Sequence, residues 1–259
     1  APAAGTLVKA KTALLFDWDN RWAIQDVKAL SENTKNYEKT CIGIWKEFQK
    51  LGVEMDVVSS NDDLSDYKVV VAPMLYLLQS GTAENLQKFV KNGGQLLATY
   101  FTGYVDKDTL CYLGGFPGDG LAELFGVISE EIDTLYPSDR NSLCFLDGKK
   151  WTVYDYAEIL RVQDAQILAS YGTDFYEGSA ALTVKEWESD THTGENGRAY
   201  YIAARVAPEE MGSLFETMLA NAGIAVKDLP GEVEYHQRQG EDTTYEFYLN
   251  HGKEKSLIK

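Results

Sequence analysis

The 259-residue chain has few cysteines and no surplus of positive charge. Its three cysteines, Cys41, Cys111 and Cys144, lie too far apart in the sequence for a CxxC or metal-ligand spacing. Such a sparse, odd set argues against a disulfide framework and is typical of a reducing compartment, so we expect a cytoplasmic protein. Lys and Arg number 24 against 40 Asp and Glu, a formal net charge of −16. Because this charge repels phosphates and anionic lipid head groups, we expect neither nucleic acid nor membrane as a partner.

Long apolar runs are also missing. No stretch approaches the roughly 18 apolar residues of a membrane-spanning helix, and the first residues lack the basic and apolar regions of a signal peptide. Hydrophobic residues nevertheless make up 44% of the chain, which is enough for a packed core. The length allows one large domain, or one domain with a small appendage.

The first hundred residues alternate between strand and helix patterns. Short apolar segments predict strands at 12–17, 53–58, 68–72 and 95–100, while apolar residues at spacings of three and four predict helices at 37–51 and from Thr82, as the cap, to Gly93. This alternation predicts a parallel sheet with helices on both faces. We therefore expect a doubly wound α/β fold of the flavodoxin-like or class I glutamine amidotransferase-like kind.

The pattern loosens after residue 104. Residues 134–150 are polar and rich in turn formers, and the later elements expected are a short helix at 121–125, strands at 165–171 and 198–204 and a helix at 208–222. Residues 226–231 resemble a linker, and apolar residues then alternate with polar ones in two short stretches. We predict a main domain at 10–226 and a short antiparallel β segment at 232–259, which is too small to hold a core of its own.

Enzyme signatures are incomplete. Asp17 and Asp19 follow the first strand, as the acidic pair of haloacid-dehalogenase phosphatases does, but no later strand ends in the acidic pair that would hold Mg²⁺. The turn at 100–103 lacks the cysteine of an amidotransferase elbow, and no G-x-S-x-G motif is present. The adjacent Glu130 and Glu131 would point to opposite sides of an extended segment, so we expect surface charge there. We predict no catalytic residue, cofactor or metal site.

Aromatic side chains provide the remaining candidates. Trp18 and Trp22 flank an acidic loop after the first strand, and other aromatics lie among glycines and charges in later loops, as exposed anchors at an interface would. The candidate interface or sugar-proximal residues are Trp18, Asp19, Asn20, Trp22, Phe101, Tyr104 and Phe116.

Several motifs together resemble one known family. The segment 13–22 (ALLFDWDNRW) is similar to the sequence that opens the second domain of glycoside hydrolase family 42 β-galactosidases, and 69–78 (VVVAPMLYLL) and 92–103 (NGGQLLATYFTG) resemble its next segments. Shorter matches follow in the expected order at 121–126, 197–202 and 245–251. Each motif alone is weak, but six in order cover almost the entire chain.

The resemblance implies a non-catalytic role. In that family a separate (β/α)₈ barrel carries the catalytic glutamates, and an amidotransferase-like domain holds three subunits together. The expected partners are therefore two further copies of the chain and the barrel, with galactosides bound only through the parent enzyme. Two alternatives stay open: a free-standing α/β enzyme, of the phosphatase or divergent amidotransferase type, and a carbohydrate-binding module.

Overall fold

The computed structural model describes residues 3–28, 32, 35–189 and 195–253. Most strands join one mixed sheet, in the order β11-β7-β6-β8-β9-β10-β4-β3-β1-β2, with β5 paired to β7. Five neighbouring strands at one end of this sheet run parallel. They are β2 (Met55–Val58), β1 (Thr12–Leu15), β3 (Val69–Ala72), β4 (Gln95–Thr99) and β10 (Gly197–Ile202). The predicted parallel sheet is therefore present.

The other end of the sheet is antiparallel and was largely missed by the sequence analysis. It comprises β5 (Val127–Asp133), β6 (Asn141–Phe145), β7 (Lys150–Val162), β8 (Gln166–Tyr171), β9 (Ala180–Trp187) and β11 (Ala204–Val206). The region 134–150, expected to consist of turns, contains β6, and Glu130 and Glu131 in β5 are both exposed, as expected. These strands mix buried positions with half-buried and exposed ones, so their composition lacks the strong apolar signal of the parallel strands.

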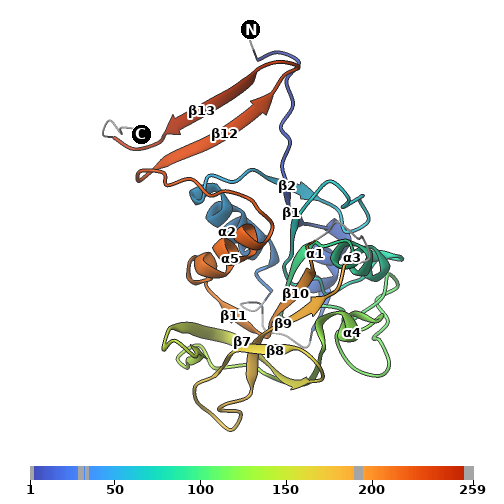
Figure 1. Cartoon of the computed structure of the whole chain (residues 1–259). Helices are drawn as coiled ribbons and strands as arrows, with labels where there is room; N and C mark the ends of the chain where they lie inside the picture. Colours follow the sequence, from blue (N-terminus) through green and yellow to red (C-terminus); the bar gives the residue numbers. More distant parts are fainter. Residues whose placement is uncertain (1–2, 29–31, 33–34, 190–194, 254–259) are drawn as a thin grey trace.

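Helices cover both faces of the parallel strands (Figure 1). On one face lie α2 (Tyr37–Lys50) and α5 (Gly212–Asn221), which follows a short 3₁₀ helix, η2 (Pro208–Met211). On the other lie α3 (Thr82–Lys91) and α4 (Leu121–Phe125). Because side chains alternate along a strand, Leu14 packs in the first layer while Ala13 and Leu15 pack in the second. Thr82 is the first residue of α3 and not its cap, because Gly81 takes the cap position with φ 87°.

The expected loop after the first strand is instead a helix, α1 (Trp18–Asp26). Asp17 has the extended backbone of an N-cap residue, and Asp19 lies in the first turn, where a negative charge is favoured by the helix dipole. These same carboxylates suggested a ligand-binding loop in the sequence. Trp18 and Trp22 are four residues apart and therefore lie on one face of α1.

A separate two-stranded sheet projects from the main body, beside the N-terminal segment (Figure 1). It consists of β12 (Val233–Gln239) and β13 (Thr244–Asn250), which pair antiparallel as predicted. Leu7 and Gln239 exchange backbone hydrogen bonds of 2.9 and 2.8 Å, so the start of the chain extends this sheet. The end of the predicted segment 232–259, residues 254–259, lies outside the described residues.

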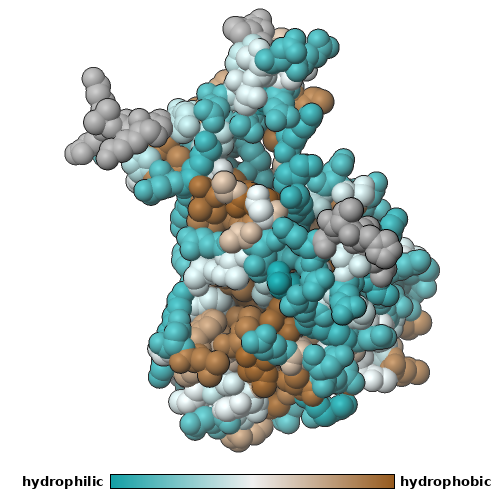
Figure 2. Space-filling model, viewed as in Figure 1, coloured by the Kyte–Doolittle hydropathy of each residue, from teal (hydrophilic) through white to brown (hydrophobic). Residues whose placement is uncertain are grey.

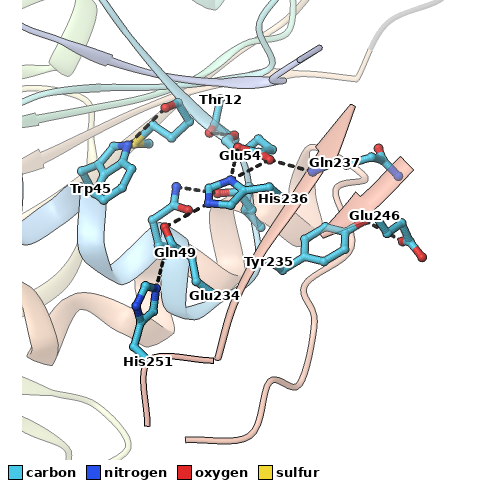
Figure 3. A network of polar contacts seen from close by, with 12 residues as sticks. Thr12, Trp45, Gln49, Glu54, Glu234, Tyr235, His236, Gln237, Glu246 and His251 are labelled. Atoms are coloured by element: carbon cyan, nitrogen blue, oxygen red, sulfur yellow. Dashed lines mark hydrogen bonds and ion pairs between the residues drawn. The ribbon is translucent and has the colours of Figure 1, made fainter. Parts of the chain in front are cut away.

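Polar contacts attach this hairpin to the main domain (Figure 3). The Glu54 carboxylate, just before β2, accepts a hydrogen bond of 2.8 Å from the backbone N–H of Gln237 and lies 3.1 Å from Nδ1 of His236. Nε2 of the same imidazole lies 3.0 Å from Glu234, which also contacts His251 at 2.7 Å. Both ring nitrogens of His236 thus face a carboxylate. Among the described helices, none has the length and apolar character needed to cross a membrane.

Candidate functional site

The carboxyl ends of parallel strands are where open α/β sheets bind ligands. In this chain, Asp17 is the second residue after β1, and its buried side chain is hydrogen-bonded to other residues of the chain. Its carboxylate accepts hydrogen bonds from the Ser59 hydroxyl at 2.6 Å and from the backbone N–H of Ser60 at 3.2 Å. Asp17 therefore acts as an internal acceptor that fixes the loop after β2.

Asp19 and Asn20 point away from Asp17 to different partners. Asp19 is exposed and accepts a hydrogen bond of 2.7 Å from the side chain of Gln79. Asn20 is fully buried: its amide donates to the Met74 carbonyl at 3.0 Å and accepts from the backbone N–H of Leu77 at 2.9 Å. Asn20 was a candidate interface residue, but its position in the core contradicts a contact with a ligand or neighbour.

The turn after β4 is filled by aromatic rings. Phe101 has a left-handed backbone, with φ 68°, and its ring stacks on Tyr76 with centroids 4.6 Å apart. Tyr104 stacks on Phe116 at 4.1 Å. Phe101 and Tyr104 are only 3% and 6% exposed, so their predicted role as exposed anchors is wrong. Phe116 is partly buried against the same core. The glycines and charges around these aromatics suggested exposure, but the rings pack on one another.

Below this turn lies a carboxyl group that the sequence analysis missed. Glu158, on β7, is fully buried. Its carboxylate accepts hydrogen bonds from the backbone N–H of Phe101 at 2.7 Å, from the Tyr104 hydroxyl at 2.9 Å and from the Tyr201 hydroxyl at 2.7 Å. Burial raises the pKa of Glu158 from 4.5 to about 7, against the opposing effect of these donors. Recognising β7 as a buried strand would have identified Glu158 as an internal charge.

The residues at the two positions after β1 and after β4 differ from what the enzyme alternatives require. A phosphatase needs a carboxylate free to attack and a divalent cation beside it, whereas Asp17 is held by the loop after β2. Within the described ranges, no three His, Cys, Asp or Glu side chains are placed to hold a metal ion. The position after β4, which carries the nucleophile in an elbow-type active site, holds Phe101, whose side chain has no nucleophilic atom.

The exposed surface of α1 and α2 has a different character. Trp18 and Trp22 are 58% and 55% exposed, with ring centroids 6.2 Å apart. Beside Trp18 lies a groove of about 400 Å³, whose lining includes Ile42 and Trp45 of α2 and Val57 of β2. We call this surface, made of Trp18, Trp22, Ile42, Trp45 and Val57, the tryptophan face. Two of the sequence-predicted residues are thus exposed together, next to an edge strand of the sheet.

Comparisons with known proteins agree on one family. Residues 10–225 match the model of the β-galactosidase trimerisation domain. β-Galactosidase BglY of Alicyclobacillus acidocaldarius is 39% identical over 259 residues, and β-galactosidase Pbg of Clostridium perfringens is 36% identical over 263 residues. These alignments cover 96% and 98% of this chain but only 36% and 37% of the relatives. The chain therefore spans little more than a third of the proteins it resembles.

Solved structures give the same result. The β-galactosidase of Bacillus circulans sp. alkalophilus superposes with a TM-score of 0.89 at 30% identity, covering 97% of this chain and 37% of that one. Gan42B, a family 42 β-galactosidase of G. stearothermophilus, superposes with a TM-score of 0.85 at 33% identity, covering 93% and 34%. The resemblance expected from the sequence motifs is confirmed, and this chain belongs to the trimerisation-domain family of glycoside hydrolase family 42 β-galactosidases.

Proposed function

We propose that this chain is a non-catalytic scaffold that assembles a β-galactosidase as a homotrimer. The single observation that carries this proposal is a contrast between two surfaces. The sheet edge where an α/β enzyme would hold its substrate is filled by Asp17, Asn20 and Phe101, whereas the tryptophan face is apolar and open. A family whose described role is trimerisation needs the second kind of surface and not the first.

The proposed fold type is flavodoxin-like, and close to that of the class I glutamine amidotransferases. Support comes from the order of the parallel strands, β2-β1-β3-β4-β10, which is the 2-1-3-4-5 order of doubly wound flavodoxin-like sheets. We also propose two units, a trimerisation domain at 10–226 and a partial β unit at 232–259. The separate sheet of β12 and β13 supports that division.

The catalytic partner in this proposal is a barrel domain outside this chain. The relatives are β-galactosidases and are almost three times as long as the aligned segment, so hydrolysis of terminal β-galactosides is assigned to the parent enzyme. Galactosides would then contact this domain only through the parent. A cytoplasmic location is proposed because Cys41, Cys111 and Cys144 are all free thiols.

The tryptophan face is the proposed contact between copies. Tryptophan is enriched among the residues that dominate binding energies at interfaces, because its ring buries a large area with few rotatable bonds. Arg21 lies 5.5 Å from the Trp18 ring and pairs with Glu38, which keeps polar groups at the rim of the face. An apolar centre with a polar rim is the usual anatomy of such contacts.

Light scattering coupled to size-exclusion chromatography tests the proposal. We expect the wild-type chain to have the mass of three chains and the Trp18→Ala/Trp22→Ala variant to have a lower mass. The matched control is Tyr136→Ala, which removes an aromatic ring that is 76% exposed but lies outside the tryptophan face. If the Trp18→Ala/Trp22→Ala variant keeps the wild-type mass, the tryptophan face is not part of the interface.

The carbohydrate-binding alternative rests on the same two rings, because paired tryptophans can also stack on sugars. Calorimetric titration with galactose separates the two functions. The scaffold proposal expects no heat of binding, whereas binding abolished in the double variant would favour a carbohydrate-binding module.

A further inference from the structure

A second apolar surface lies on the main domain, remote in sequence from the tryptophan face. A cavity of about 730 Å³ opens between α5 and strands β6 to β10, and its apolar lining includes Trp151, Leu168, Val184 and Leu214. Figure 2 shows hydrophobic residues gathered over β7, β8 and β9, below the position of α5 in Figure 1. Leu146, in the turn between β6 and β7, stands at its rim and is 99% exposed.

The charge around this cavity is close to neutral. Three acidic residues line it, Asp147, Asp164 and Glu186, together with the two basic residues Lys149 and Arg198. The chain as a whole carries −16. Two copies of so acidic a chain repel each other over most of their surfaces. The cavity is a place where a second copy can approach without bringing many carboxylates together.

Threefold assembly imposes a geometric requirement on these surfaces. A closed ring of three uses heterologous contacts, in which one patch of each subunit meets a different patch of the next. The tryptophan face alone therefore cannot build a trimer and needs a counterpart elsewhere on the same chain. Building on the proposed function, we propose that the cavity between α5 and β6–β10 is that counterpart and receives the tryptophan face of the neighbouring copy.

Size and shape support this pairing. Trp18 and Trp22 lie on consecutive turns of α1 with their rings 6.2 Å apart, so they can enter one depression together. A volume of about 730 Å³ lies within the range of about 300–1,000 Å³ in which protein sites enclose compact organic groups. Leu146 at the rim then covers the inserted rings, which explains a leucine exposed on a turn.

Leu146→Glu tests the cavity, with Leu113→Glu as the matched control. Both leucines are 99% exposed, so neither change disturbs the core, and Leu113 lies outside both proposed surfaces. In light scattering we expect the mass of Leu146→Glu to fall from three chains toward one, because the new charge is buried against the neighbour's rings. Leu113→Glu is expected to keep the mass of three chains.

Mixing two variants tests whether the surfaces meet each other. Leu146→Glu keeps an intact tryptophan face, and Trp18→Ala/Trp22→Ala keeps an intact cavity. In an equimolar mixture, the tryptophan face of the first variant can bind the cavity of the second, but the reverse contact cannot form. We therefore expect a mass of two chains, since the ring of three cannot close.

The outcomes separate this inference from the proposed function. If the wild-type chain has the mass of three chains and Leu146→Glu also does, the cavity is not the contact and only this inference is wrong. If each variant alone has the mass of one chain and their mixture also has the mass of one chain, the two surfaces do not bind each other. That result also overturns this inference. A wild-type chain of single mass overturns the proposed function, and the inference with it.

Discussion

The backbone N–H of Phe101 donates a hydrogen bond of 2.7 Å to the buried carboxylate of Glu158. This contact ties the turn after β4 of the parallel strands to β7 of the antiparallel ones. The hydroxyls of Tyr104 and Tyr201 also donate to this carboxylate and complete an internal network.

This network predicts a pH-dependent stability. Burial raises the pKa of Glu158 from 4.5 in the unfolded chain to about 7 in the fold. The stability that protonated Glu158 contributes is complete below pH 4.5 and is lost as the pH rises through about 7. We expect this group to lower the free energy of unfolding by about 3 kcal/mol across that window, since one pKa unit is about 1.4 kcal/mol.

Urea unfolding of wild type and Glu158→Gln, at a series of pH values across that window, measures the effect. Glutamine keeps the size of the side chain but cannot titrate, so the fall in stability with rising pH is expected to be smaller in the variant. The slopes are compared, and not the absolute stabilities, because glutamine also changes the hydrogen bonds. Equal slopes in the two proteins would show that folding does not raise the pKa of Glu158.

A second prediction concerns Asn20. Its side chain pairs with two buried backbone groups, the Met74 carbonyl and the Leu77 N–H. Asn20→Ala leaves the buried N–H of Leu77 without this partner, whereas the Met74 carbonyl still accepts from the backbone N–H of Tyr76. We expect a loss of about 1–3 kcal/mol in unfolding free energy. Asp19→Ala, which removes an exposed neighbour, is expected to cost less than about 1 kcal/mol. Denaturant titration of both variants gives the comparison, and an equal loss would contradict the core role of Asn20.

The third prediction is that the hairpin of β12 and β13 can lose its attachment to the main domain without a change in the stability of the main sheet. Glu54→Ala removes the acceptor of the Gln237 N–H and the partner of His236 (Figure 3). Hydrogen exchange in β12 is then expected to accelerate by about tenfold or more, while the amides of β4 exchange at the wild-type rate. Glu131→Ala, at an exposed position in β5, is the control. Unchanged exchange in β12 would mean that other contacts hold the hairpin.

Catalytic silence is the fourth prediction. We expect no turnover of a chromogenic β-galactoside, and no tight Mg²⁺ binding in calorimetry, because Asp17 already accepts hydrogen bonds from Ser59 and Ser60. Turnover that disappears when a residue of this chain is changed would contradict the scaffold function. Mg²⁺ binding that is lost in Asp17→Asn would support the phosphatase alternative instead.

The sequence predicts the parallel half of the fold well, for a physical reason. Strands buried on both faces, such as β3 and β4, are nearly all apolar, and α2 repeats its apolar residues at helical spacing. The antiparallel strands β5 to β7 mix buried with exposed positions, so local composition does not reveal them. The longest motifs of the family resemblance, at 13–22, 69–78 and 92–103, lie on this well-patterned parallel half.

The candidate site was predicted only in part. Trp18 and Trp22 are exposed as expected, because α1 turns Asn20 and Ile24 toward the core and the two indole rings toward the surface. Phe101 and Tyr104 are buried because rings from the connections after β3 and after β4 stack on one another, and that contact depends on tertiary structure. The internal charge of Glu158 was missed for the same reason.

The mass of the wild-type chain in solution tests the central claim most directly. A trimerisation domain with apolar contact surfaces is expected to bury on the order of 2,000 Å² or more in each contact and to remain assembled on dilution. Light scattering coupled to size exclusion should therefore give about three times the chain mass of 28.9 kDa. A mass of 28.9 kDa, unchanged at hundreds of micromolar protein, would contradict the account.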